Sequence, residues 1–249
     1  MIELKTAEEI GRMRKAGIVV GKLLALLAAR IKPGIKTKAL DEEALVFIKA
    51  QGATPAFLGY RGYPATICVS INDEVVHGIP GERVIREGDI VSIDAGAFCE
   101  GYCADAALTV GVGPVSKQAQ QLIDVTRRSL EAAIALATPE HRLSDLSHAV
   151  QDVVEREGFS VVRDFVGHGI GRAMHEDPPI PNYGPPNRGP RLKPGMVLAI
   201  EPMVALGSWE VDVLADGWTA VTRDHSLAAH FEHTIAVTDE GSRVLTQLN

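Results

Sequence analysis

The sequence predicts an α+β fold made of two related halves, and three observations support this. The first is a short phrase that occurs twice: residues 88–94 read Gly-Asp-Ile-Val-Ser-Ile-Asp, and residues 195–201 read Gly-Met-Val-Leu-Ala-Ile-Glu. Each has a turn glycine, a β-prone run and then a carboxylate where the strand should end. Two halves that bring Asp94 and Glu201 to one place predict a metal site or an acid/base pair between them.

The second observation is that the similarity extends backwards along the chain. Pro33–Gly52 and Pro139–Gly158 each carry apolar residues at helical spacing between an early proline and a final glycine, which are helix boundary signals. The offset between the copies is nearly the same here as at the doubled phrase. This half-length period indicates a two-fold duplication, about 1–112 and 113–249, rather than a solenoid of short repeats.

The third observation is the order of elements, which is two helices followed by antiparallel strands in each half. The expected helices are 6–29, 37–50, 117–136 and 142–157. The expected strands lie near 65–71, 74–77, 89–97, 103–110, 160–165, 196–205, 211–214 and 231–238. This is an α+β pattern. Packing the halves about a pseudo-two-fold axis would form one curved antiparallel sheet with outer helices and a central cleft.

Composition narrows the class of protein. The 249 residues are 46% hydrophobic, enough for a substantial core, and we expect a single catalytic domain over 1–249. A net charge of −7 argues against a general nucleic-acid binder. No apolar run reaches the roughly 18 residues that a membrane span needs. The three cysteines form no CxxC pair, which favours free thiols in a reducing cytoplasm.

The first candidate site is a hairpin with an acid on each strand. If its turn centres on Cys99 and Glu100, Asp94 lies directly opposite Asp105, with Cβ atoms about 5 Å apart. A different turn would shift this pairing by a residue or so. Facing carboxylates repel, so a cation must lie between them or one of them must hold a proton. The alternative is a pair of solvent-exposed edge acids.

Histidines supply the next candidates. His168 stands between glycines in Gly167–Gly171, which lets the backbone come close to a ligand. His175 follows seven residues later, before a proline-rich stretch, Pro178–Pro194, that we expect to be an ordered loop near the site. His77 lies in a weaker His-Gly-Ile signal. The remaining histidines are expected at the surface or facing away from Glu232: His141, His148, His225, His230 and His233.

Glu232 begins an apolar strand, a position where a glutamate is usually solvated. Together with Asp94, Asp105, Glu201 and one histidine it makes an oxygen-rich set without thiolate, which suits Mn²⁺, Fe²⁺, Co²⁺ or Zn²⁺. Four carboxylates are too many for one catalytic ion with open positions. They suit two ions about 3.5–4 Å apart that lower the pKa of a shared water, which predicts hydrolysis.

Five stretches together resemble the bacterial type I methionine aminopeptidases, of the "pita-bread" metallopeptidase fold, over about residues 3–247. These stretches are Phe57–Pro64, Ile71–Pro80, Gly167–Gly171, Ile200–Met203 and Phe231–Thr234. The resemblance implies hydrolytic removal of the initiator methionine from nascent proteins and peptides, with a small second residue preferred. Attack would come from a water or hydroxide that bridges two divalent ions, Co²⁺, Mn²⁺, Fe²⁺ or Zn²⁺.

The resemblance also assigns roles to residues. It makes Asp94, Asp105, His168, Glu201 and Glu232 the metal ligands, with Asp105 and Glu232 bridging and Glu201 also moving the water proton. His77 would contact substrate near its amine, and His175 would bind the scissile peptide and stabilise the tetrahedral intermediate. The methionine pocket would be lined by Tyr60, Tyr63, Cys68, Met174 and Trp218.

Two departures from the family pattern carry expectations. Met174 stands where many relatives have an aromatic residue, which would loosen side-chain selection. Ala106 and Ala107 stand where a Thr-Ser pair is common, so hydroxyls that could support a metal-binding carboxylate are missing. We therefore expect weaker metal affinity than in relatives that keep those hydroxyls.

Two other functions compete with this one. An X-Pro dipeptidase or aminopeptidase would share the ligands, but such enzymes generally carry an extra N-terminal domain, for which 249 residues leave no room. A catalytically inactive binding protein would typically have lost ligands, and all five positions are filled. The expected partner is the N-terminal methionine of nascent polypeptides, with the ribosome near its exit tunnel as a candidate. We expect a cytoplasmic monomer that binds neither DNA nor membranes.

Overall fold

The computed structural model describes residues 1–248 and has a large antiparallel sheet at its centre. Nine strands form this sheet, in the order β1-β4-β5-β14-β9-β7-β8, with β2 also paired to β4 and β15 to β14. Its strands are β1 (Thr54–Pro55), β2 (Ile67–Ile71), β4 (Ile90–Cys99), β5 (Tyr102–Gly111), β7 (Gly167–Gly169), β8 (Glu176–Ile180), β9 (Val197–Ile200), β14 (Glu232–Thr238) and β15 (Gly241–Val244). The α+β class and the curved antiparallel sheet are confirmed.

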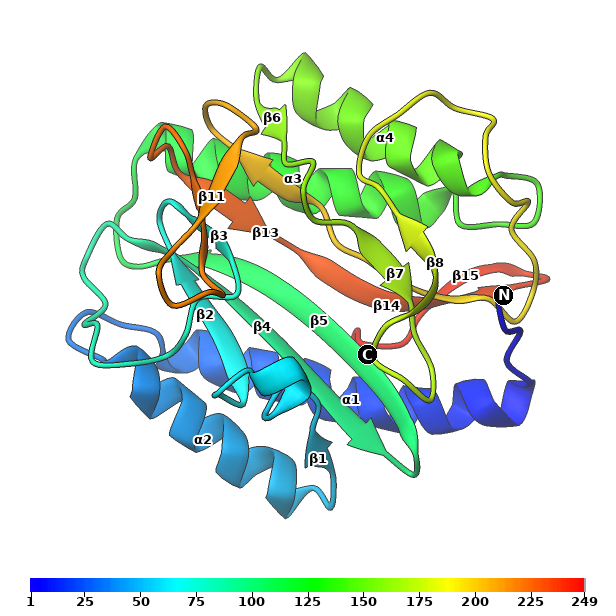
Figure 1. Ribbon diagram of the computed structural model, residues 1–249, viewed down its shortest axis with the longest axis horizontal. Helices are drawn as coiled ribbons and strands as arrows, with labels where there is room; N and C mark the ends of the chain where they lie inside the picture. The colour runs from blue at the N-terminus through cyan, green and yellow to red at the C-terminus, as the bar shows by residue number, and fades with distance from the viewer. Residues whose placement is uncertain (249) are drawn as a thin grey trace.

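The four expected helices are present with their ends within one residue of the prediction. They are α1 (Ala7–Arg30), α2 (Thr37–Ala50), α3 (Lys117–Ala135) and α4 (Leu143–Arg156). In Figure 1, α1 and α2 lie along the lower side beside the first-half strands, and α3 and α4 lie along the upper side. Each pair buries its apolar face against the sheet, so each half has its own hydrophobic core.

The internal repeat is visible in the backbone. Gly88 and Gly195, which open the doubled phrase, have φ of 89° and 92°. Gly52 and Gly158, which end the second helix of each half, have φ of 68° and 81°. These are left-handed conformations that glycine adopts without steric cost, so the two halves use the same turn chemistry at matching positions.

The register expected for the acid hairpin was wrong by two residues. Asp94 lies opposite Ala107, and Asp105 lies opposite Gly96. The turn centres on Glu100 and Gly101, whose φ values of 50° and 80° fit a two-residue turn that matches strand twist. A shift of two residues keeps both carboxylates on one face of the sheet, as diagonal neighbours.

The strand expected over 196–205 is two strands in different sheets. β9 ends at Ile200, and β10 (Met203–Ala205) joins a separate sheet of order β13-β10-β6. Pro202 lies in the break, where it cannot donate a ladder hydrogen bond. The proline-rich stretch is also only partly loop, because Pro178 and Pro179 belong to β8, at the edge of the sheet where proline is tolerated.

Short elements complete the fold. The second small sheet has the order β11-β12-β3. The elements outside the large sheet are η1 (Tyr60–Gly62), β3 (Glu74–Val76), β6 (Ser160–Val161), β10, β11 (Val211–Val213), β12 (Ala220–Thr222) and β13 (Ala228–His230). Across the whole fold, the elements that the sequence did not predict, such as β1 and β8, span two to five residues. Hydrophobic periodicity cannot identify elements this short. No helix within residues 1–248 is long and apolar enough to cross a membrane.

Candidate metal centre and substrate pocket

Five adjacent strands of the large sheet each contribute one of the expected metal-binding residues. Across the order β4-β5-β14-β9-β7 these residues are Asp94, Asp105, Glu232, Glu201 and His168, with Glu201 directly after the end of β9. Ala107 lies opposite both Asp94 and Glu232, so a small side chain separates two acids in one cross-strand row. The pairing of the strands therefore gathers residues that are far apart in the sequence.

The tightest part of this cluster contains Asp105, His168 and Glu232. Ligand atoms of these three side chains lie within 4.8 Å of one another, and all three residues are buried. His168 Nε2 is 3.5 Å from Asp105 Oδ2 and 3.6 Å from Glu201 Oε1. Thr234 donates a 2.9 Å hydrogen bond to Asp105 Oδ1, which orients that carboxylate.

Burial makes this cluster electrostatically costly. It raises the pKa of Asp94, Glu201 and Glu232 well above the usual carboxyl range, and repulsion between neighbouring carboxylates adds to the effect. Burial also raises the pKa of Asp105, although His168 and Thr234 oppose the shift. Within residues 1–248, Asp94 Oδ1 is buried without a hydrogen-bond partner. Such a group calls for a cation.

An apolar cavity opens beside the cluster. It has a volume of about 170 Å³ and borders all five candidate metal ligands. Its other walls are Phe57, Tyr60, Arg61, Tyr63, Cys68, His77, Met174, His175 and Trp218. All the pocket residues expected from the sequence therefore lie together, and Phe57 and Arg61 join them.

Aromatic contacts fix two of the pocket side chains. The rings of Tyr63 and Trp218 meet edge to face with centroids 5.1 Å apart. The Tyr63 hydroxyl donates to the carbonyl oxygens of Ile67 and Gly78, both at 3.1 Å. Its polar end is thus satisfied by backbone, which leaves the ring as an apolar wall of the cavity.

The two expected substrate histidines both line the cavity and contact different rings, His77 those of Phe165 and Trp218 and His175 those of Tyr60 and His168. His77 has φ of 62°, an uncommon conformation for a side-chain-bearing residue that often marks a functional site. His175 stacks on Tyr60 with ring centroids 5.3 Å apart, and its Nδ1 is 2.9 Å from the Tyr60 hydroxyl. Burial, then the positive groups nearby, lowers the pKa of His175 to about 4. Both rings are therefore neutral at pH 7, since burial lowers the pKa of His77 as well.

His230 is a buried residue whose contact with the site the sequence did not predict. It was expected to face away from Glu232, and its Nε2 lies 3.8 Å from Glu201 Oε2 in a fully buried position. Strand alternation was applied across Phe231, where β13 ends and β14 begins in a different sheet, so the alternation does not hold. By contrast, His148 and His225 are exposed as expected.

A buried cluster of carboxylates and a histidine beside a partly enclosed pocket with aromatic walls is typical of metal-dependent hydrolases that bind small substrates or substrate ends. The chain belongs to metallopeptidase family M24, whose family model matches residues 11–239.

Relatives and solved structures agree with this assignment. Over 248 residues the chain is 56% identical to methionine aminopeptidase 1 of Bacillus subtilis (strain 168), covering 100% of both. The crystal structure of methionine aminopeptidase from Thermotoga maritima superposes with a TM-score of 0.98 at 50% identity, again over 100% of both chains. Prolidase from Pyrococcus furiosus has a TM-score of 0.81 at 24% identity over 99% of this chain and 66% of that one, which reflects a shared fold.

Proposed function

We propose that this protein is a metal-dependent aminopeptidase that removes the N-terminal methionine from peptides and nascent proteins. One observation carries the proposal: a pocket of about 170 Å³ with an aromatic and sulfur-bearing wall borders a buried cluster of four carboxylates and a histidine. A pocket of this size would receive one apolar side chain beside the metal-binding groups, which favours cleavage after the first residue. The full-length similarity to methionine aminopeptidases supports methionine as that residue.

The side chains present fit divalent metal ions. Within residues 1–248, none of the four carboxylates pairs with a lysine or arginine. Asp105 and Glu201 lie within 4 Å of histidine nitrogens, and Asp94 Oδ1 has no hydrogen-bond partner. We infer that Asp94, Asp105, His168, Glu201 and Glu232 hold two ions. Oxygen ligands with one imidazole suit Co²⁺, Mn²⁺, Fe²⁺ and Zn²⁺ alike. When bound, the ions would lower the pKa of a water and polarise the scissile carbonyl.

The protein's own groups would move and hold the reacting atoms. Glu201, which lies within 4 Å of His168 and His230, would take the proton of the attacking water and return it to the leaving amine as the peptide bond breaks. His175 is neutral at pH 7. When the Tyr60 hydroxyl donates a hydrogen bond to Nδ1, the ring proton is on Nε2. Nε2–H can then donate a hydrogen bond to the scissile carbonyl oxygen. This hydrogen bond would strengthen as negative charge develops on that oxygen.

The cavity walls would provide selectivity. Tyr60, Tyr63, Cys68, Met174 and Trp218 form a mostly apolar surface, which suits a polarizable thioether. The ring centroids of His77 and Trp218 are 6.2 Å apart. His77 would contact the substrate near its amine. A small second residue would be preferred, because the substrate must fit beside His175 and the proline-rich stretch Pro178–Pro194.

The remaining assignments follow from the substrate. The N-terminal methionine of a new protein becomes accessible where chains leave the ribosome, so we propose a cytoplasmic enzyme that works as a monomer near the exit tunnel. Binding to ribosomes measured by co-sedimentation, and mass from light scattering, test these two points separately from catalysis.

The deciding experiment is a peptide assay. Metal-free protein is reconstituted with Mn²⁺, Fe²⁺, Co²⁺ or Zn²⁺ and given Met-Ala-Ser, Met-Leu-Ser and an Xaa-Pro dipeptide, with elemental analysis of the purified protein. We expect release of methionine, fastest from Met-Ala-Ser, and a stoichiometry of two ions. Cleavage of the Xaa-Pro dipeptide alone would favour the prolidase-like function, and no cleavage with any of the four ions would favour a binding protein.

A further inference from the structure

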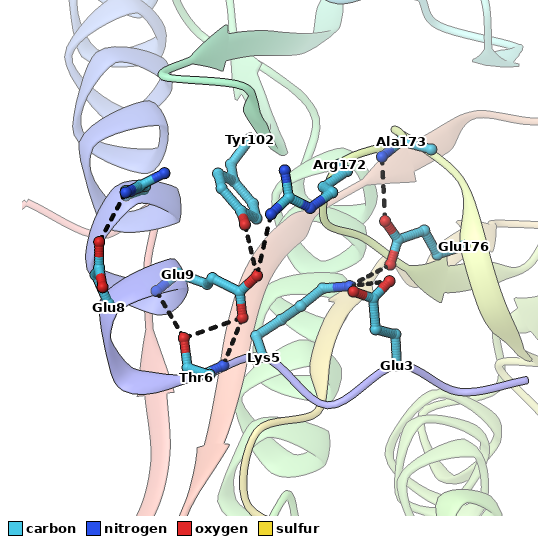
Figure 2. Close-up of polar contacts among 10 residues, drawn as sticks. Glu3, Lys5, Thr6, Glu8, Glu9, Tyr102, Arg172, Ala173 and Glu176 are labelled. Carbon is cyan, nitrogen blue, oxygen red and sulfur yellow. Dashed lines mark hydrogen bonds and ion pairs between the residues drawn. The ribbon is translucent and has the colours of Figure 1, made fainter.

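A buried lysine links the N-terminal segment to the loop that carries His175 (Figure 2). The side chain of Lys5 is 1% exposed, and its Nζ donates a 2.8 Å hydrogen bond to Glu176 Oε2. Glu3 Oε2 is the second partner, at 3.0 Å. The backbone N–H of Lys5 also donates to Gly195 O at 2.7 Å, which anchors the segment beside the sheet. A buried ammonium of this kind is costly unless its partners remain in place.

The carboxylate of Glu176 joins Lys5 to the loop by accepting hydrogen bonds from both. Its Oε1 accepts a 3.1 Å hydrogen bond from the backbone N–H of Ala173, and its Oε2 accepts from Lys5. Ala173 O in turn accepts from Gly171 N–H at 3.0 Å, and Gly171 O accepts from Cys103 N–H at 2.8 Å. The carboxylate of Glu176 therefore connects the backbone of loop 171–175 to the buried ammonium of Lys5 by two hydrogen bonds.

Gly171 shows how closely the lysine and the loop are fitted. A Cβ at this position would lie 2.4 Å from Lys5 Cε and 2.7 Å from Glu176 Oε1. No real Cβ approaches so closely, so the lysine side chain occupies the space that any larger residue would need. The sequence suggested that the glycines around His168 let a ligand approach the backbone. At Gly171 the close neighbours are instead the side chains of Lys5 and Glu176.

A second, more exposed contact supports the same loop. Arg172 lies over the Tyr102 ring, with Cζ 4.7 Å from the centroid, and its Nη2 is 3.4 Å from Glu9 Oε1. The Tyr102 hydroxyl donates to the same Glu9 oxygen at 2.6 Å. Figure 2 shows both contacts on the side of the loop that faces α1. Arg172 is exposed, so we assign the main constraint to the buried Lys5–Glu176 pair.

We propose that Lys5 is a positioning residue for peptide hydrolysis, acting through Glu176 to hold His175 in the substrate pocket. His175 adjoins Glu176 in the chain, and its ring packs between Tyr60 and His168, 5.3 Å and 4.2 Å away between centroids. Without the ammonium, Glu176 would keep a largely buried charge without its partner. Its carboxylate would turn toward water and release Ala173 N–H. This inference rests on the proposed function, because it needs His175 to act on the peptide.

The kinetic test compares Lys5→Met, Lys5→Arg and Glu176→Gln with the control Lys15→Met. Lys15 makes an exposed 2.6 Å ion pair with Glu100, so the control removes a lysine without touching the loop.

With Met-Ala-Ser at saturating metal, we expect Lys5→Met to lower kcat by roughly 10- to 100-fold, the scale of a 1 Å misplacement. KM should change by less than about threefold, since pocket binding remains. Metal affinity should not change, and Lys5→Arg should recover part of kcat. Lys15→Met should match the unaltered protein.

Double substitutions separate positioning from general stability. In a His175→Ala background, Lys5→Met should cause no further loss beyond about twofold, because the group that it positions is already gone. In a His77→Ala background its effect should multiply in full, because His77 packs against Phe165 and Trp218 rather than against loop 171–175. Equal losses in both backgrounds, or an unchanged kcat in Lys5→Met, would overturn the proposal.

A structural readout keeps this inference distinct from the proposed function. In ¹⁵N-histidine NMR spectra, assigned with His175→Ala, Lys5→Met should shift or broaden the His175 ring signals and leave those of exposed His148 in place. An unchanged His175 signal would contradict positioning whatever the activity. If the unaltered protein cleaves no methionyl peptide, the proposed function fails, and the NMR result still decides whether Lys5 positions His175.

Discussion

Asp105 lies at the centre of the candidate metal site, between His168 on one side and Thr234 on the other. Asp105→Asn keeps the shape of the side chain but removes its charge. We expect peptide hydrolysis to fall by more than about 100-fold, with weaker metal binding, because a neutral amide would hold a divalent ion less tightly than a carboxylate. Steady-state kinetics and calorimetric metal titration measure the two effects. Asp124→Asn, in an exposed ion pair with Arg127, is the matched control, and full activity in Asp105→Asn would exclude a metal mechanism.

The two alanines after Asp105 face opposite sides of the sheet. Ala107 lies in the row with Asp94 and Glu232, whereas Ala106 belongs to the hydrophobic core beneath. A hydroxyl at 107 could donate to a carboxylate of the site, and outer hydrogen bonds of this kind change metal affinity about tenfold or more. Ala107→Ser should therefore tighten metal binding by about tenfold in a calorimetric titration.

Ala106→Ser is the internal control for that experiment. It buries a hydroxyl in an apolar core, so it should lower the free energy of unfolding by about 1–3 kcal/mol without improving metal affinity. Equal affinity gains in both variants would mean that the hydroxyl acts through overall stability rather than through a neighbouring carboxylate.

At the scale of elements, α1 begins with a reciprocal cap that also connects to the loop of His175. Glu9 N–H donates to Thr6 Oγ1, and Thr6 N–H donates to Glu9 Oε2. The Tyr102 hydroxyl, then Thr6, lowers the pKa of Glu9 to about 2, so this acid is charged at pH 7. Thr6→Ala should lower the free energy of unfolding by about 1 kcal/mol in urea titrations.

The equivalent cap on α3 provides a comparison. Ser116 Oγ accepts from Ala119 N–H, but Ser116 takes no part in the Glu9 network. Ser116→Ala should cost a similar free energy of unfolding while leaving kcat unchanged. A loss of activity in Thr6→Ala but not in Ser116→Ala would place the difference in the connection to loop 171–175.

The sequence predicted long elements well and short ones poorly. α1 to α4 carry several turns of apolar periodicity with boundary residues, so local physics sets their ends. β7, with three residues, has no period to detect, and the break between β9 and β10 depends on which sheet each half-strand joins. The hairpin register missed by two because the positive φ values of Glu100 and Gly101 decide the turn, not strand symmetry.

At the scale of the whole molecule, β14 joins the two halves. It pairs with β5 of the first half and with β9 of the second. We propose that residues 1–249 form one catalytic domain, and metal-free protein should therefore unfold in a single calorimetric transition whose van't Hoff and calorimetric enthalpies agree. Two separable transitions would show that the halves are independent units.

Stability should also depend on pH through the buried acids. Burial, followed by neighbouring carboxylates, raises the pKa of Asp94 and Glu201 above their ordinary values of 3.8 and 4.5. The folded chain then binds protons more tightly than the unfolded chain. The resulting stability is complete below those ordinary values and is lost as pH rises toward the raised pKa.

Metal binding removes this dependence, because ligands lose their protons when they bind. The increase in Tm on adding metal should therefore grow as pH rises above the ordinary carboxyl pKa values, because the metal-free protein then loses more of this stability. Buried histidines that do not bind metal contribute equally to the Tm of the metal-free and the metal-bound protein, so they do not affect this difference in Tm. Glu201→Gln should flatten the pH dependence of the metal-free protein, and a constant metal-induced shift in Tm would contradict the explanation.

The sequence by itself determined the fold class, the four helices, and a set of carboxylates and histidines that the structure places around one cavity. These depend on periodicity, turn residues and residue chemistry, which are local properties of the chain. Only the tertiary structure decided the hairpin register, the division of 196–205, the proximity of His230 to Glu201, and the path of Lys5 under the loop of His175. Those features depend on contacts between residues far apart in sequence, whose energies no local pattern encodes.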